Sequence, residues 1–230
     1  MSDPYFSSVV LLVANDNAAD GTTTFVDQSN SAHTMVAAGL MKYSTAQAPT
    51  GMTSSGLATN TGDSVASVAS TDFSFAGDFT WECFAYHTSH ATNQTLINIG
   101  VSDQFVWYID TAAKVNYFDG SNNVLGANTM PDSTWTHLAL VRSGTTLTSY
   151  IGGTAGNAPI TVASTIGGNL ALTLFYDLGS AEWTGNMASI RITKGVARYT
   201  ADFTPPSLPL PITGAVFVPQ IMNLRRQMAA

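Results

Sequence analysis

The sequence predicts an all-β protein in which two antiparallel sheets pack face to face, followed by a short C-terminal extension. Its strong segments alternate with a period of two and are rich in the β-branched and aromatic residues that suit a pleated, half-buried surface. Turn residues recur at roughly the 8–12 residue spacing that is typical of sandwiches. Before the C-terminus no long run has the helical period, so an antiparallel sandwich is favoured over an α/β fold.

Composition excludes several classes of protein. The chain has 230 residues, of which 45% are hydrophobic and only 10% charged, and a domain of this length can bury a core without a staple or a metal ion. Cys83 is the only cysteine, which excludes a disulfide scaffold. The net charge of −7 is opposite in sign to a nucleic-acid-binding surface. The apolar run Val9–Ala14 is too short for a signal sequence or a membrane span, so we expect neither a secretion signal nor a membrane partner.

Individual strands follow from the alternation. Phe79–Tyr86 is largely apolar on both faces, which indicates a strand inside the sandwich that is also covered by a loop or a second layer. The segment 135–142 is similar, and a glycine-containing turn connects it to the alternating run 147–151, which predicts a hairpin. The segments 105–110 and 115–118 predict a second hairpin.

The composition changes near the C-terminus. Residues 204–211 hold four of the nine prolines, and proline cannot donate to a sheet ladder. We therefore predict a domain body over residues 1–204 and a proline-rich linker with an anchoring extension over residues 205–230. Apolar residues at positions 221, 224 and 228 match one face of a short helix, which needs a surface to dock on.

Charge supports the docking hypothesis. Residues 1–190 hold 3 basic and 14 acidic side chains, whereas residues 191–230 hold 5 basic and 1 acidic side chain. A basic, apolar end after an acidic body indicates packing against that body, a symmetry mate or another acidic protein, with a solvated tail as the alternative. The residues expected to anchor a partner are Phe217, Ile221, Leu224, Arg225 and Arg226.

Two segments resemble a known family. The hairpin segment 135–153, WTHLALVRSGTTLTSYIGG, resembles that of laminin-G-like, concanavalin A-like jelly-roll domains. The segment 189–206, SIRITKGVARYTADFTPP, is similar to the closing strand and tail of the branch of that family common in tailed-bacteriophage structural proteins. Segments 3–12 and 78–82 are similar to the same branch, so the resemblance spans roughly residues 3–209.

The resemblance implies a concanavalin A-like jelly roll whose relatives bind glycans, proteins or calcium, or serve as building blocks of virions. We expect a non-enzymatic virion structural protein, either a capsid decoration or head fibre or a tail-fibre component, that assembles in the host cytoplasm. Its expected partners are other virion proteins and further copies of itself, with a trimer as one arrangement. The alternative is a glycan-binding module for attachment to a host or other surface. Fold does not decide between them, because function depends on the particular sites that a fold carries.

Catalytic signatures are absent from the sequence. Glycoside hydrolysis needs two carboxylates across a cleft, but Glu82 and Glu182 are the only glutamates and lie one hundred residues apart. The acidic triplet that glycosidases of this fold carry on one strand is missing around Glu82, and no Gly-x-Ser-x-Gly motif occurs. We expect no enzymatic activity.

Metal-binding signals are weak. Loops rich in carboxylate and amide oxygens suit calcium, and the candidate ligands are Asp16, Asp27 and Asp177. Relatives often read Gly-Tyr-Ile-Asp-Glu-Leu-Arg-Ile where this chain has residues 185–192 without an acid, and turn-capping explains the remaining acids as well. No cofactor is expected, with calcium as the alternative. His87 and His90 are spaced by three, but a zinc site needs further ligands that their spacing alone does not supply.

A glycan site would use exposed aromatic rings. Most aromatics at strand period belong to a core, so loop positions are the better candidates. The residues selected as sugar platforms are Trp183, Tyr176 and Trp107.

Overall fold

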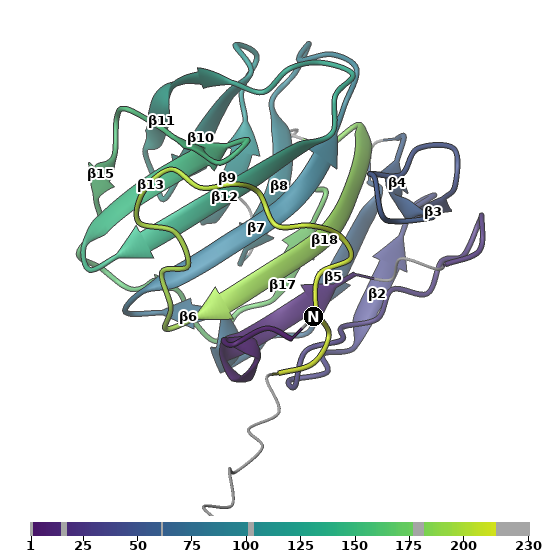
Figure 1. The fold of residues 1–230 in the computed structure, drawn as a ribbon, viewed down its shortest axis with the longest axis horizontal. Helices are drawn as coiled ribbons and strands as arrows, with labels where there is room; N and C mark the ends of the chain where they lie inside the picture. The colour runs from purple at the N-terminus through teal and green to yellow at the C-terminus, as the bar shows by residue number, and fades with distance from the viewer. Residues whose placement is uncertain (1, 15–17, 61, 101–103, 177–181, 215–230) are drawn as a thin grey trace, which may run out of the picture.

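The computed structural model describes residues 2–14, 18–60, 62–100, 104–176 and 182–214. Within these residues nearly all regular structure is β, arranged as two large antiparallel sheets (Figure 1). Two short 3₁₀ turns, η1 (Phe6–Ser8) and η2 (Thr71–Phe73), are the described helical elements. No helix among the described residues is long and apolar enough to cross a lipid bilayer. The predicted all-β, two-sheet fold is confirmed.

The larger sheet contains nine of the described strands, with β1 paired to β18 and β15 paired to β13 beside the main order β14-β13-β12-β7-β18-β4-β3. Its strands are β14 (Thr154–Ala155), β13 (Thr146–Ile151), β12 (Thr136–Ser143), β7 (Phe79–Tyr86), β18 (Gly185–Lys194), β4 (Ser55–Ala58), β3 (Lys42–Ser44), β1 (Val9–Val13) and β15 (Ile160–Thr161). The predicted hairpin over 135–151 corresponds to β12 and β13.

The smaller sheet contains seven described strands in the order β11-β10-β9-β8-β17-β5-β2. They are β11 (Asn122–Thr129), β10 (Lys114–Phe118), β9 (Phe105–Ile109), β8 (Gln94–Ile99), β17 (Leu172–Leu174), β5 (Ser64–Ser67) and β2 (Met35–Ala38). A separate pair, β6 (Ser74–Phe75) with β16 (Ile166–Gly167), completes the described strands. The second predicted hairpin corresponds to β9 and β10.

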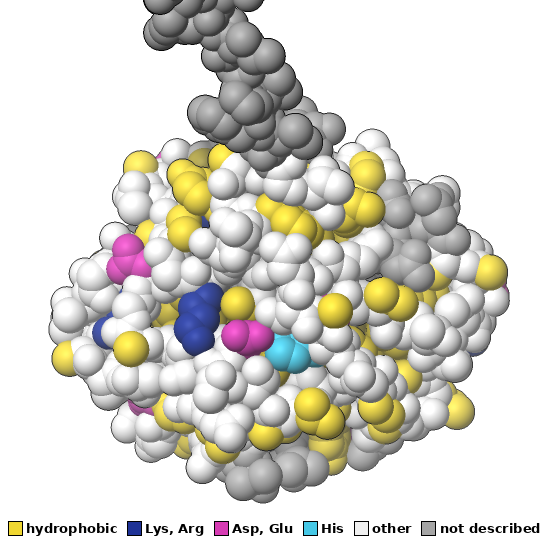
Figure 2. Space-filling model, turned by 90° about the horizontal axis from the view of Figure 1, so that it is seen from below, with side chains coloured by type: hydrophobic (Ala, Val, Ile, Leu, Met, Phe, Trp, Pro, Cys, Tyr) yellow, Lys and Arg dark blue, Asp and Glu magenta, His cyan; other side chains and the backbone are white. Residues whose placement is uncertain are grey.

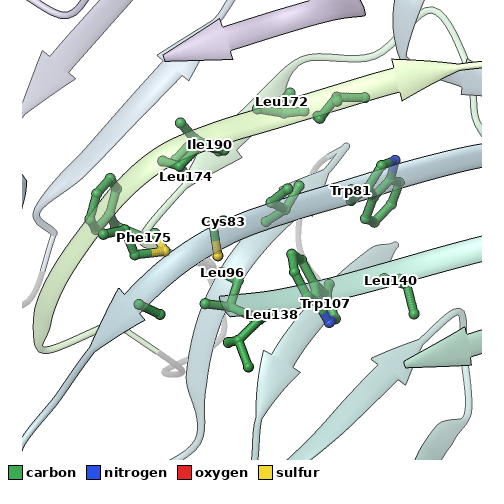
Figure 3. Close-up of a cluster of buried hydrophobic side chains, with 14 of the residues drawn as sticks. Trp81, Cys83, Leu96, Trp107, Leu138, Leu140, Leu172, Leu174, Phe175 and Ile190 are labelled. Carbon is green, nitrogen blue, oxygen red and sulfur yellow. The ribbon is translucent and has the colours of Figure 1, made fainter. Parts of the chain in front are cut away.

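The hydrophobic core lies between the two sheets. In β7 the alternate residues Phe79, Trp81, Cys83 and Ala85 are all buried in the main hydrophobic cluster, as the period of two predicts. Figure 3 shows Trp81 and Cys83 of β7 beside Leu96, Trp107, Leu138, Leu140, Leu172, Leu174, Phe175 and Ile190. The core therefore draws side chains from both layers.

The other face of the larger sheet is partly covered by residues 195–210, which we call the strap (Figure 1). Tyr199 and Phe203 stack on each other with ring centroids 3.6 Å apart and pack against a cluster formed by β12 and β13. Further on, Leu208 and Leu210 pack against the N-terminal segment. Close to that point Asp3 forms a parallel bridge with Gly214.

The strap corrects the predicted domain boundary at residue 204. Leu210 is 2% exposed and belongs to a hydrophobic cluster with Phe6, Val9 and Leu12, so the packed body continues at least to Leu210. Proline does end the sheet ladder there, as expected, but the chain stays on the sheet by apolar contact. Residues 215–230 lie outside the described residues, and with them the predicted anchoring set Phe217, Ile221, Leu224, Arg225 and Arg226.

Candidate functional site

A row of half-buried aromatic side chains lies on the face of the larger sheet that the strap only partly covers. Phe84 and Tyr86 alternate with the buried residues of β7, so the pleat places both on this face. Trp135 precedes β12, and the pairing of Thr136 with Ala85 brings it beside the end of β7. The ring centroids of Tyr86 and Trp135 are 5.6 Å apart.

An open groove runs along this row. It has a volume of about 390 Å³ and is bordered by a loop, the sheet and the strap. Its lining residues are Pro49, Thr50, Gly51, Phe84, Trp135, Pro206, Ser207 and Leu208. Gly51 has a φ of +94° and approaches the carbonyl group of Leu208 so closely that a Cβ atom there would overlap it. The loop and the strap therefore form one continuous wall.

The chemistry of this groove suits binding of a neutral, partly apolar ligand. Its volume falls in the range of roughly 300–1,000 Å³ that is typical of small-molecule sites. Aromatic rings offer flat apolar faces, while the hydroxyl groups of Thr50 and Ser207 and the nearby backbone offer hydrogen bonds. None of the lining residues is ionisable, so the groove walls supply no general acid or base.

The carboxylate of Glu82 is fully buried beneath this face and is held by four side chains. Its Oε1 accepts hydrogen bonds from Nε of Arg191 at 2.8 Å and lies 2.7 Å from Nη2 of the same residue. Its Oε2 lies 3.0 Å from Nε2 of His137 and accepts a hydrogen bond from the hydroxyl group of Tyr199 at 2.7 Å. Arg198 completes the set, with Nε 3.7 Å from Oε1.

These contacts determine the charge on Glu82. Burial alone would raise its pKa, but the charge of Arg191, the hydrogen bond and charge of His137 and the charge of Arg198 outweigh burial and hold the pKa at about 2. The second carboxylate, Asp3, lies 3.0 Å from Arg191 and 2.7 Å from Arg198. The network therefore joins β7, β18, the strap and the N-terminal segment, and its oxygens are used in structural contacts.

A second hollow, of about 460 Å³, lies near β6 and the end of β18. Its charged residues already have partners, because Nζ of Lys194 donates to the carbonyl of Thr71 and Asp78 accepts from the amide of Gly144. Its aromatic residue, Phe75, is 1% exposed. This hollow therefore offers no exposed ring, and the aromatic groove is the stronger site for a neutral ligand.

The structure corrects two of the three sugar platforms selected from the sequence. Trp107 and Trp183 are 0% exposed and belong to the main core, so neither ring is accessible to a ligand. Trp183 lies outside the described strands, so no alternation of side chains indicates that it is buried. Its backbone amide donates to the carbonyl of Phe175 at 2.8 Å. Tyr176 is half-buried but does not line the aromatic groove.

Of the three predicted calcium ligands, the structure describes Asp27. Asp27 is 5% exposed, and its two oxygens accept four hydrogen bonds, from the amides of Leu12, Ser29 and His33 and from the hydroxyl of Ser29. This carboxylate caps a loop and has little remaining capacity for a cation. Asp16 and Asp177 lie outside the described residues.

Phe84 and Trp135 are the groove residues that sequence reasoning missed. The alternation along β7 places Phe84 on the face opposite to Trp81 and Cys83. The sequence predicts a loop or a second layer that covers that face. The strap covers β12 and β13 near Tyr199 and Phe203 and leaves the row at Phe84 open. Figure 2 shows another face of the molecule, on which charged side chains are few and apolar ones are scattered, in keeping with the low charge of the sequence.

Comparison with known families agrees with this architecture. The profile of the concanavalin A-like lectin/glucanases superfamily matches residues 59–198, which is more than half of the chain. The chain belongs to this superfamily. No curated protein has a sequence that matches this superfamily member.

Solved structures of the lectin/glucanase fold are similar to the chain at low sequence identity. Domain 4 of an extracellular arabinanase from Geobacillus stearothermophilus, in complex with arabinotriose, has a TM-score of 0.62 and 13% identity, covering 83% of this chain and 94% of that one. Botulinum neurotoxin type C, whose cell entry depends on interaction with two ganglioside molecules, has a TM-score of 0.58 and 14% identity, covering 82% and 48%. A Trypanosoma rangeli sialidase mutant with trans-sialidase activity has a TM-score of 0.56 and 10% identity, covering 84% and 31%. The chain thus spans about half or less of the toxin and sialidase chains.

Proposed function

We propose that this protein is a non-enzymatic carbohydrate-binding module and that the aromatic groove holds the sugar. The observation that carries the proposal is the open row of Phe84 and Trp135 in a groove whose lining has no ionisable side chain. Such a groove favours stacking on the apolar face of a sugar ring, with hydroxyl and backbone groups bonding its edge. The absence of an acid among the lining residues favours binding over hydrolysis.

Two further observations support a binding role. Glu82, the residue at which a catalytic carboxylate was sought, is fully buried in a satisfied ion-pair network. The arabinanase domain that shares the fold was solved with arabinotriose, which makes neutral oligosaccharides the first ligands to test.

The test is a glycan array followed by titration calorimetry with the best ligand, starting from arabino-oligosaccharides. Loss of a stacking ring typically costs about 1–3 kcal/mol, as measured for bases on aromatic side chains, so Trp135→Ala is expected to weaken binding by about 5- to 150-fold. Tyr176→Ala is the matched control, because Tyr176 is a half-buried aromatic that does not line the groove. Binding that Trp135→Ala leaves unchanged, or an array without any bound glycan, contradicts the proposal.

A second proposal concerns where the module works: on the surface of a tailed-bacteriophage particle, as a capsid decoration, head-fibre or tail-fibre component. It is supported by the resemblance of segment 189–206 to phage structural proteins, a segment that forms most of β18 and the first part of the strap. Its partners are then other virion proteins and copies of the same chain. Mass spectrometry of purified particles, separated into heads and tails, is expected to detect the chain in one fraction, and its absence from both contradicts this proposal.

A further inference from the structure

Two histidines and one aspartate converge where two connections of the sandwich meet. His87 follows β7 directly, and His90 lies in the connection from β7 to β8. Asp132 lies in the connection from β11 to β12. One ligand atom from each of the three lies within 4.8 Å of the other two, and this is the single group of that kind among the described residues.

The orientation of the His87 ring is fixed. Its Nδ1 lies 3.0 Å from the carbonyl oxygen of Ser89, and since a carbonyl only accepts, Nδ1 carries the hydrogen. The side-chain amide Nε2 of Gln94 donates to the same carbonyl at 2.7 Å. Nε2 of His87 is thus the nitrogen that faces the cluster, and a ligating histidine that donates its other ring nitrogen to a backbone carbonyl is the usual arrangement in metal sites.

Nε2 of His87 also lacks a partner. The side chain of His87 is 0% exposed, and Nε2 makes no hydrogen bond within the described residues. Asp132 Oδ1 is 3.8 Å away, beyond hydrogen-bond range. A buried nitrogen without a partner destabilises the fold, and a cation between His87, His90 and Asp132 would satisfy it.

The distances fit a small divalent cation. Zinc–ligand bonds of about 2.0–2.2 Å in a tetrahedron place neighbouring ligand atoms about 3.3 Å apart. Nδ1 of His90 lies 2.8 Å from Oδ1 of Asp132, and Nε2 of His87 lies 3.8 Å from the same oxygen. These separations bracket the tetrahedral value, so small rotations of exposed Asp132 would complete the geometry.

We infer that His87, His90 and Asp132 form a binding site for a zinc-class divalent cation. Two imidazoles and one carboxylate are ligands that Zn²⁺ accepts and Ca²⁺ does not prefer. Asp132 is about half-exposed, which provides an entry route and leaves the fourth position to water.

The expected role of the ion is to join the two connections. The amide of Ser133 already donates to the carbonyl of His87 at 2.7 Å, so the backbones are held in register before an ion binds. A bound cation would add ligand bonds from both connections. This inference does not depend on what the aromatic groove binds.

The experiment titrates Zn²⁺ into the metal-free full chain by calorimetry and records the visible absorption of a Co²⁺-loaded sample. We expect one ion per chain, a tetrahedral Co²⁺ spectrum and a higher melting temperature with Zn²⁺. Asp132→Asn and His90→Ala are expected to weaken binding by more than about 100-fold, the upper range for residues that only orient a ligand.

The matched control is the pair His33 and Asp72, which lie 3.1 Å apart but lack a third ligand among the described residues. His33→Ala and Asp72→Asn are expected to leave Zn²⁺ affinity unchanged. Asp132→Asn replaces an exposed side chain and is expected to fold, which its circular dichroism spectrum checks. The inference is overturned if the native chain binds no Zn²⁺ or Co²⁺, or if the control variants lose binding to the same extent as Asp132→Asn.

Discussion

Arg191 lies directly opposite Glu82 in the ladder between β18 and β7, and its guanidinium contacts one carboxylate oxygen of Glu82 at 2.7 and 2.8 Å. Both side chains are almost completely buried. The pair is therefore part of the packed structure between sheet and strap, where either charge alone would be costly.

Removing one partner of this pair should destabilise the fold strongly. Glu82→Gln leaves the guanidinium of Arg191 without its main counter-ion, and the loss of one partner of a buried pair typically costs about 3–5 kcal/mol. Denaturant unfolding followed by tryptophan fluorescence measures the change. The double variant Glu82→Leu with Arg191→Met is expected to recover part of the loss, and a single variant within about 1 kcal/mol of the native chain would contradict the role assigned to the pair.

Acid should weaken the fold through the same carboxylate. The pKa of Glu82 falls from its ordinary value of 4.5 to about 2 in the folded chain, so the unfolded state binds more protons between these values. The contribution, roughly 3 kcal/mol, is fully present above pH 4.5 and is lost as the pH falls through 2. Asp3, whose pKa is also lowered, adds in the same direction.

Unfolding free energies of the native chain and of Glu82→Gln, measured from pH 7 down to pH 2.5, check this dependence. The difference between the two proteins is expected to narrow as the pH falls. A constant difference over the whole range would show that Glu82 does not titrate as described.

Gly153 holds the strap against the sheet and should not tolerate a side chain. It has a φ of +84°, and a Cβ atom there would overlap the carbonyl oxygen of Phe203. Gly153→Ala is therefore expected to displace the strap and speed tryptic cleavage after Arg198, whose side chain is only 7% exposed. Mass spectrometry of the fragments identifies the cleavage site.

Gly152→Ala is the matched control for this experiment. Gly152 has a φ of +61° but no atom near the position of an added Cβ. Gly152→Ala therefore introduces the same kind of backbone strain as Gly153→Ala, without the steric clash against the strap. Equal rates of cleavage in the two variants would assign the effect to backbone strain and not to the strap contact.

Asp27 should act as a loop cap that needs no calcium. Asp27→Ala removes the acceptor of four hydrogen bonds and leaves buried donors unsatisfied, for a loss of about 2 kcal/mol or more. Thermal unfolding of the metal-free native chain is expected to give the same melting temperature with and without added calcium. A calcium-dependent rise that disappears in Asp27→Ala would instead restore Asp27 as a ligand.

The sequence predicted the layers better than the site, for a physical reason. Alternation along residues 79–86 divides the side chains of β7 between two faces, and the structure buries one of these faces, Phe79, Trp81, Cys83 and Ala85, in the main core. Burial of Trp183, in contrast, depends on packing with residues far away in the sequence, such as His87. Local pattern contains no information about such contacts.

The aromatic groove and the histidine cluster show the same limit. Trp135 reaches Tyr86, and Asp132 reaches His87, because β12 pairs with β7 in one particular register. The spacing of His87 and His90 was visible in the sequence, but the third ligand, Asp132, lies 45 residues after His87 and 42 after His90. In both cases the contact depends on the register between β12 and β7, which the sequence pattern does not determine.

The bridge between Asp3 and Gly214 has a practical meaning for protein engineering. These two residues are adjacent, with the amide of Asp3 donating to the carbonyl of Thr213 at 3.0 Å, so a short peptide linker can join them. New termini can then be opened at the exposed turn around Gly120, between β10 and β11. A circular permutant of this kind would carry a fused protein at the turn between β10 and β11, away from the original termini. The order of the strands in the two sheets would stay the same.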